Sequence, residues 1–152
     1  MYSAGLWLHS WLRWGVILLG VLAVVRALGA LRARRWTPAD DRAGGLFTIA
    51  FDVQFLVGLI LSFALSPLTK QAMQHMDVAM RTGSIRYWAV EHPFGMVAAL
   101  VLAHVGRVMV RRVPEAKKAR TAVIFFALAL LLVLALTPWP NMPGHRPLFR
   151  LP

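Results

Sequence analysis

The sequence predicts an all-α integral membrane protein, a four-helix bundle, and three observations support this fold class. Of the 152 residues, 59% are hydrophobic and 15% are charged, whereas a soluble domain has about 25% charged residues. The apolar residues gather into four long blocks, and the mean hydropathy of the chain is +0.62. Together with the lack of cysteine, these features exclude a water-soluble globule, a disordered chain and a secreted disulfide scaffold.

Each apolar block is long enough to cross a lipid bilayer. A hydrocarbon core about 30 Å thick needs roughly 20 helical residues that rise about 1.5 Å each. The blocks predict spans over residues 6–31, 46–66, 87–110 and 121–139. The first block is too long for a cleaved signal peptide and has no basic segment before it. Since the pattern shows no repeat and no second domain, residues 1–152 are expected to form a single membrane domain.

The distribution of positive charge predicts the orientation of the spans. The net charge is +11, from 17 Lys and Arg against 6 Asp and Glu. The loops after the first and third spans contain nine Lys and Arg, and the opposite side contains five. These two loops are therefore expected in the cytoplasm and both termini outside, in a multi-pass protein of the bacterial inner (cytoplasmic) membrane. Five tryptophans fit as interfacial anchors, four at outer ends and one at an inner end: Trp7, Trp11, Trp88, Trp139 and Trp36.

Two segments outside the spans have patterns of their own. Met73, Met76 and Met80 recur at helical spacing, which predicts a short amphipathic helix on the outer surface between spans 2 and 3. With His75, these methionines are also a donor set suited to copper. The outer tail over residues 138–152 is rich in proline, which excludes a regular helix and predicts an extended segment. Such a tail would be ordered best by lying along another membrane subunit.

Ionisable residues inside the predicted spans fall into two layers. Each charge in hydrocarbon costs roughly 2.5–3.5 kcal/mol, so each needs a partner or a function. The outer layer contains His9, Arg13, Glu91 and His92, and the inner layer contains Arg26, Asp52 and His104. Ion pairs of Arg13 with Glu91 and of Arg26 with Asp52 would join different helices and set their register.

The two outer histidines suggest a cofactor. Neutral imidazole is a good iron ligand, so His9 and His92, at similar depth on facing helices, could hold one b-type haem. Arg13 could neutralise a haem propionate. The alternative is that both histidines lie at the headgroup boundary without a ligand. His92 and His104 are twelve residues apart and do not share a helix face, so the chain by itself can hold at most one haem.

The third span contains two features that affect packing. Gly95, Ala99 and Ala103 follow one another at four-residue steps, which predicts a face that allows close helix approach. Pro93 makes two different first residues possible for this helix. Either the helix begins before this proline and is kinked, or it begins at Pro93 and His92 becomes its cap.

Three segments resemble a group of uncharacterised small four-span bacterial membrane proteins that are loosely labelled cytochrome b-like. They are LHSWLRW at residues 8–14, VEHPFGM at residues 90–96, and the dipeptide Gly106–Arg107. The resemblance covers nearly the whole chain. It implies five positions of interest: His9, Arg13, Glu91, His92 and Arg107.

These observations lead to a functional expectation with two alternatives. The chain is expected to be a small subunit of a larger energy-converting complex, redox or photosynthetic, with one haem b near the outer face and no catalytic activity of its own. One alternative is a structural or assembly subunit without a cofactor, and the other is a copper-handling membrane protein. Nothing in the sequence indicates binding to nucleic acid.

Overall fold

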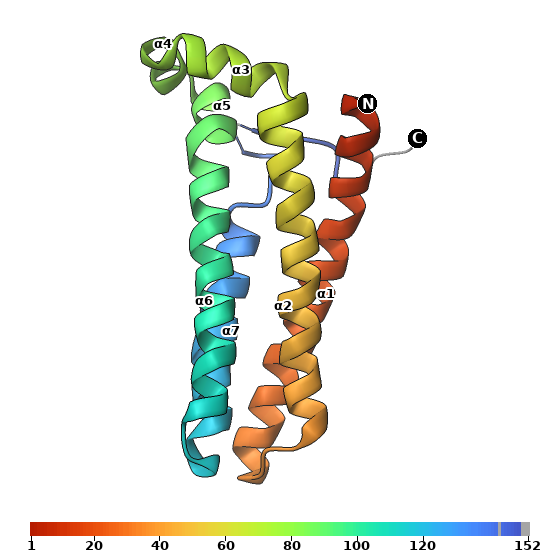
Figure 1. Ribbon diagram of the computed structural model, residues 1–152, viewed down its shortest axis with the longest axis vertical. Helices are drawn as coiled ribbons and strands as arrows, with labels where there is room; N and C mark the ends of the chain where they lie inside the picture. The colour runs from red at the N-terminus through yellow and green to blue at the C-terminus, as the bar shows by residue number, and fades with distance from the viewer. Residues whose placement is uncertain (143, 150–152) are drawn as a thin grey trace.

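The computed structural model describes residues 1–142 and 144–149 as an up-and-down bundle of four long helical segments (Figure 1). The main helices are α1 (Tyr2–Ala33), α2 (Pro38–Leu59), α6 (His92–Arg112) and α7 (Glu115–Ala135). With the helical turns that extend α2 and α6, all four are long and apolar enough to cross a membrane. The predicted all-helical class is confirmed, and the four helices suggest a multi-pass membrane protein.

Five shorter helical segments complete the fold: η1 (Ile60–Leu65), α3 (Pro67–Gln74), α4 (Met76–Arg81), α5 (Gly83–Arg86) and η2 (Tyr87–Glu91). The π-helical segment η1 continues α2, and η2 leads into α6. Between them, α3 and α4 lie across one end of the bundle, the end at which the chain begins (Figure 1). This end, which also carries the described part of the tail, is called the terminal end below.

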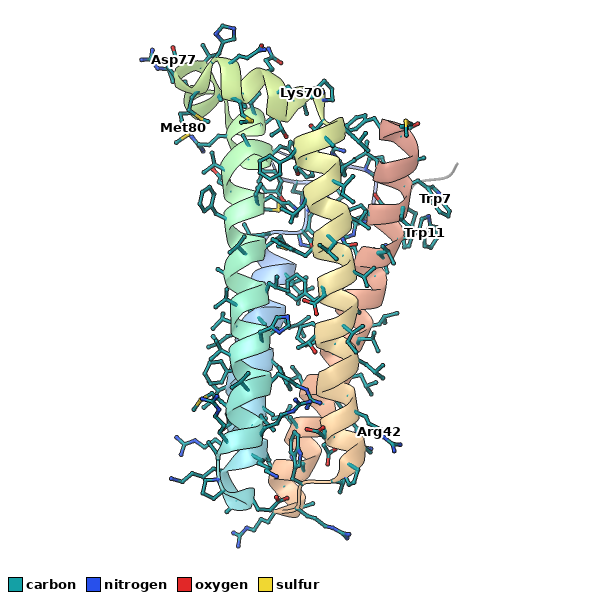
Figure 2. All side chains as sticks on the ribbon, in the orientation of Figure 1. Trp7, Trp11, Arg42, Lys70, Asp77 and Met80 are labelled. Carbon is teal, nitrogen blue, oxygen red and sulfur yellow. The ribbon has the colours of Figure 1, made fainter. Side chains whose placement is uncertain are left out.

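The predicted amphipathic helix between spans 2 and 3 is instead two short helices. The break falls at His75, whose φ of −136° and ψ of 65° end α3 before α4 begins. The buried positions of this segment include Ala72 and Ala79, each 1% exposed, while the methionines are exposed. Figure 2 shows Met80 and Asp77 at the tip that α4 forms. The segment thus packs through small residues, which leaves the methionines on its outer side.

All four long helices differ in their bounds from the expected spans, and two of the differences have a clear local cause. The second begins at Pro38 and not at residue 46, because Thr37 and Asp40 form a capping box with proline at the first helical position. The Thr37 backbone N–H donates to the Asp40 carboxylate at 2.8 Å. The fourth ends at Ala135 and not at residue 139, since the residue before Pro138 is disfavoured in the α conformation.

The predicted small-residue face of α6 packs against α7. Ala99 and Ala103 are completely buried. A Cβ atom on Gly95 would overlap the side chain of Leu136, and one on Gly106 would overlap Phe125. The face that the sequence predicts is confirmed and extends one turn further, to Gly106.

The structure also answers the question of where the third span begins. The helix is continuous over Gly83–Arg112, so it starts before Pro93 and His92 lies within it. In a regular α-helix the proline ring would clash with the carbonyl group four residues earlier, that of Ala89. The π-helical turn η2 includes Ala89 and widens the helix at this point.

Candidate functional site

A cavity of about 260 Å³ lies near the terminal end of the bundle. Its walls come from α1, α2, η1 and α6, and residues of the tail cover it. Most of the lining is apolar. The polar side chains in the lining include His9, Arg13, Gln54, His92 and Arg146. Three of these were singled out from the sequence as cofactor-binding candidates.

The structure brings His9 and His92 together. His9 comes from α1 and His92 is the first residue of α6, and their ring centres are 6.4 Å apart with an interplanar angle of 74°. Depth counted from the sequence predicted that they lie at a similar level. Their contact across the bundle depends on how α2 and α7, which pack against both helices, place α1 relative to α6.

Both histidines are held by hydrogen bonds that leave one ring nitrogen unused. The Nδ1 atom of His92 lies 2.9 Å from the carbonyl oxygen of Leu136, so as a donor it leaves Nε2 with its lone pair. The Gln54 amide nitrogen lies 3.2 Å from His9 Nε2 and donates to the His9 carbonyl oxygen at 3.0 Å. His9 Nδ1 is buried and has no partner within the described residues. Gly58 gives the His9 ring room, because a Cβ atom there would lie 3.0 Å from its Cε1.

Three buried polar atoms without a hydrogen-bond partner line this cavity: His9 Nδ1, Arg13 Nε and Gln54 Oε1. They are all of the buried side-chain nitrogen and oxygen atoms left unpaired in the described chain. A buried polar group without a partner costs about 1–3 kcal/mol, so native structures rarely retain one without a reason. Their concentration at one place makes this cavity the candidate functional site.

Two arginines give the cavity a positive charge. Arg13 is only 8% exposed and donates to the carbonyl oxygen of Leu148 at 2.6 Å. The guanidinium of Arg146 lies 4.1 Å from the ring centre of Trp88 and donates to the hydroxyl of Tyr2 at 3.3 Å. Among the described residues, neither arginine forms an ion pair. The cavity is therefore suited to a ligand with negative charge.

The described part of the tail packs on its own bundle. Phe149 stacks on Trp14 with ring centres 5.3 Å apart and an interplanar angle of 11°. Gly144 lies so close to Tyr87 that a Cβ atom would overlap the ring. In these residues, aromatic and backbone contacts hold the tail on its own bundle. That another subunit lies along the tail stays a prediction. Pro143 and Pro152, which belong to the predicted tail, lie outside the described residues.

The end of α7 supplies part of the site. The carbonyl oxygen of Leu136 accepts a hydrogen bond from the Tyr87 hydroxyl at 2.6 Å as well as the bond to His92. The last carbonyl groups of a helix have no partner inside the helix. Tyr87 and His92 therefore cap α7, which is a structural role that requires no ligand.

The cavity opens sideways between two helices. Leu59 and Phe63, from α2 and η1, and Phe94 and Val97, from α6, line it and are also exposed. An apolar, exposed rim of this kind leaves the cavity accessible from the side of the bundle.

The ion pairs differ from those expected. Arg13 contacts the tail, while Glu91 pairs with Arg86 at 2.7 Å. The reason is local, because Arg86 precedes Glu91 by little more than one helical turn.

In the inner layer, Arg26 pairs with Asp40 at 2.9 Å, and Asp52 pairs with His104 at 2.7 Å. Asp52 lies near the middle of the helix Pro38–Leu65, since that helix begins earlier than predicted, whereas Asp40 lies in its first turn. The expected Arg26–Asp52 pair is therefore replaced by two pairs at different heights.

Sequence analysis did not identify three residues that line the cavity or form ion pairs: Gln54, Arg146 and Asp41. Gln54 contacts His9, although its position in the second span did not indicate this. Arg146 looked like an ordinary tail residue, and only the fold of the tail brings it to the cavity. Asp41 forms a two-bond ion pair with Arg107, a position that only the family resemblance marked.

The proposed copper donors lie away from the cavity. Met73, Met76 and Met80 are exposed on α3 and α4. Within the described residues, no group of three or more His, Cys, Asp and Glu could hold a metal ion. Comparison with protein families, curated proteins and solved structures finds no match for this chain.

Proposed function

We propose that this protein holds one b-type haem between His9 and His92 and acts as a small membrane subunit of a larger bacterial energy-converting complex. The observation that carries the proposal is the pairing of the two histidines inside a cavity that also collects the unpaired buried polar atoms. The orientation expected from the basic loops would place this site near the outer face of the inner membrane.

His9 and His92 are the residues that would hold the haem iron. Their ring centres are 6.4 Å apart, and neutral imidazole is a good iron ligand. Metal-bound histidines usually donate their other ring N–H to a carbonyl group or carboxylate. The contact of His92 Nδ1 with Leu136 has this form.

The two unpaired arginines fit the rest of the cofactor. A haem carries two propionates, and a guanidinium binds a carboxylate through two parallel hydrogen bonds. Arg13 and Arg146 both line the cavity without an acidic partner in the described structure. The apolar rim between α2 and α6 suits the macrocycle, and its lateral position suits uptake from the membrane.

A bound haem would supply one-electron transfer, while the protein holds and orients the group. Gln54 restrains His9, and the end of α7 restrains His92. One haem carries one electron at a time, so it needs a donor and an acceptor nearby. This requirement supports the role of a subunit over that of an independent enzyme.

A second candidate is a structural subunit without cofactor. The observation that favours it is the capping of α7 by Tyr87 and His92, which gives this histidine a use without a ligand. In that case the cavity would be filled by water or lipid.

An absorption spectrum separates the two candidates. The full chain is expressed with haem supplied, purified in mild detergent, and measured oxidised and then reduced with dithionite. The proposal predicts a Soret shift and a sharp α-band on reduction, at one haem per chain. A protein that stays colourless after incubation with haem, while still folded by circular dichroism, would favour the structural subunit.

A further inference from the structure

A polar pair lies on the surface of the bundle, where α2 and α6 meet. The Nε2 atom of His104 is 2.7 Å from an Asp52 carboxylate oxygen, and the two side chains are 49% and 42% exposed. Asp52 lies near the middle of its apolar helix, and His104 lies well inside the helix Gly83–Arg112. In a membrane, both side chains would be at hydrocarbon depth.

The residues around this pair are aliphatic and exposed. One turn away on α2 are Ile49 and Leu56, and one turn away on α6 are Val101 and Val108. Together with Asp52 and His104, these residues are called the α2–α6 face. Polar side chains inside membrane spans almost always face protein or a water-filled cavity, because hydrocarbon offers no hydrogen bonds. Half-exposed polar groups amid such residues therefore indicate that protein covers this face.

The pair has hydrogen-bonding capacity to spare. The second carboxylate oxygen of Asp52 and Nδ1 of His104 have no partner in the described part of the chain. With a hydrogen on Nδ1, the ring donates a hydrogen bond, and the second carboxylate oxygen accepts one. The pair then presents one donor, Nδ1–H, beside one acceptor oxygen.

We propose that the α2–α6 face binds a second copy of this protein through a two-fold axis. A donor beside an acceptor is self-complementary: His104 of each copy donates to Asp52 of the other, and all four side chains form one closed ring. Isologous contacts of this kind are the commonest in oligomers. A different membrane helix would have to bring both groups in matching positions, whereas a second copy does so by symmetry. The inference does not depend on haem.

Cysteine cross-linking tests the contact, because the chain has no cysteine of its own. In a face-to-face dimer, Val101 of one copy approaches Leu56 of the other. Copies with Val101→Cys and differently tagged copies with Leu56→Cys are co-expressed and oxidised in the membrane. A mixed disulfide dimer is expected. Leu131→Cys on α7, also exposed at 60%, is the matched control and should form no mixed dimer with Leu56→Cys.

The strength of the contact is measured by energy transfer between labelled copies diluted in lipid vesicles. Asp52→Leu removes both hydrogen bonds between the copies, each worth roughly threefold, and should weaken association about tenfold. The exchange variant, Asp52→His with His104→Asp, preserves the ring and should restore association to within a few-fold of the original.

Three results would overturn the proposal. The first is a protein that remains monomeric at all lipid dilutions, and the second is equal cross-linking by Leu131→Cys. The third is unchanged association of the Asp52→Leu variant. Cross-linking of Val101→Cys in native membranes to a different protein and not to a second copy would assign the face to a foreign subunit. The haem spectrum is recorded on the same samples, so loss of the dimer and loss of haem are separately visible.

Discussion

The two sides of α6 differ in how closely the neighbouring helix approaches. Toward α7, glycines and alanines bring the helices into contact, with Ala99 and Ala103 completely buried. Toward α2, the same helix carries His92 at the cavity and His104 in the exposed polar pair. The closed side provides packing, and the open side retains space and polar groups. Ligand binding and polar contacts in this protein are therefore expected on the side of α6 that packs less tightly.

The largest expected effect concerns the open side. His92→Ala removes one of the two proposed iron ligands and should abolish stoichiometric haem binding, as measured by the reduced α-band after purification. His104→Ala removes a histidine from the same helix that lies outside the cavity lining, so haem binding should be unchanged.

Because His92 also caps α7, the helical content of His92→Ala is compared with that of the original protein by circular dichroism. Haem binding that survives in folded His92→Ala at full stoichiometry, or that disappears in His104→Ala, would rule out the proposed ligand pair.

The charge of the cavity should affect haem affinity next most strongly. Arg146→Gln removes a charged donor, and hydrogen bonds to charged groups are worth about 1.5–3 kcal/mol, so affinity should fall roughly 10- to 100-fold. The positions of the absorption bands should not change, since the proposed ligands His9 and His92 remain. The measurement is a haem titration followed at the Soret band.

Arg42→Gln is the control for this titration. Arg42 lies on α2 at the opposite end of the bundle (Figure 2) and is exposed. An equal loss of affinity in both variants would mean that overall charge, and not a contact at the cavity, attracts the haem.

The closed side can be tested by adding one methyl group. The Cβ of Gly106→Ala would overlap Phe125, and such overpacking typically costs about 1–3 kcal/mol in the free energy of unfolding. Gly29→Ala adds the same atom to a helix at a point with nothing within 4 Å, so it should be neutral or gain up to about 1 kcal/mol. Unfolding in mixed detergent micelles measures both, and a similar response would contradict the assigned packing.

The smallest effect is expected at the ion pair near the end of α1. Arg26 is 43% exposed, although its partner Asp40 is buried. Exposed pairs contribute about 0–1 kcal/mol, and Asp40 keeps its capping bonds to Thr37. Arg26→Gln should therefore change the free energy of unfolding by less than about 1 kcal/mol in the same assay. A loss of several kcal/mol would show that the pair holds α1 to α2 more strongly than its exposure implies.

Most of the helical architecture is predictable from local patterns. Four long apolar blocks led to four long helices, and the four-residue spacing of Gly95, Ala99 and Ala103 identified the side that packs on α7. The missed boundaries also have local causes. The capping box at Thr37 and the proline at position 138 are both visible in the sequence, but apolar length alone does not take them into account.

The polar contacts were harder to predict. Depth along a helix follows from counting residues, which is why His9 and His92 were correctly expected at a similar level. The partner of a charged side chain also depends on the rotation of each helix about its axis. Arg26 has two acids on the next helix, and which of them it reaches depends on where that helix begins and how it is rotated.

Amino-acid order was thus sufficient for the helical class, the close α6–α7 contact and the depth of the two histidines, because each follows from hydrophobicity, residue size or a fixed rise per residue. Packing in three dimensions was needed for the cavity, for the ion-pair partners and for the tail that brings Arg146 over Trp88. These features join residues far apart along the chain, and no local rule relates the orientation of one helix to that of another.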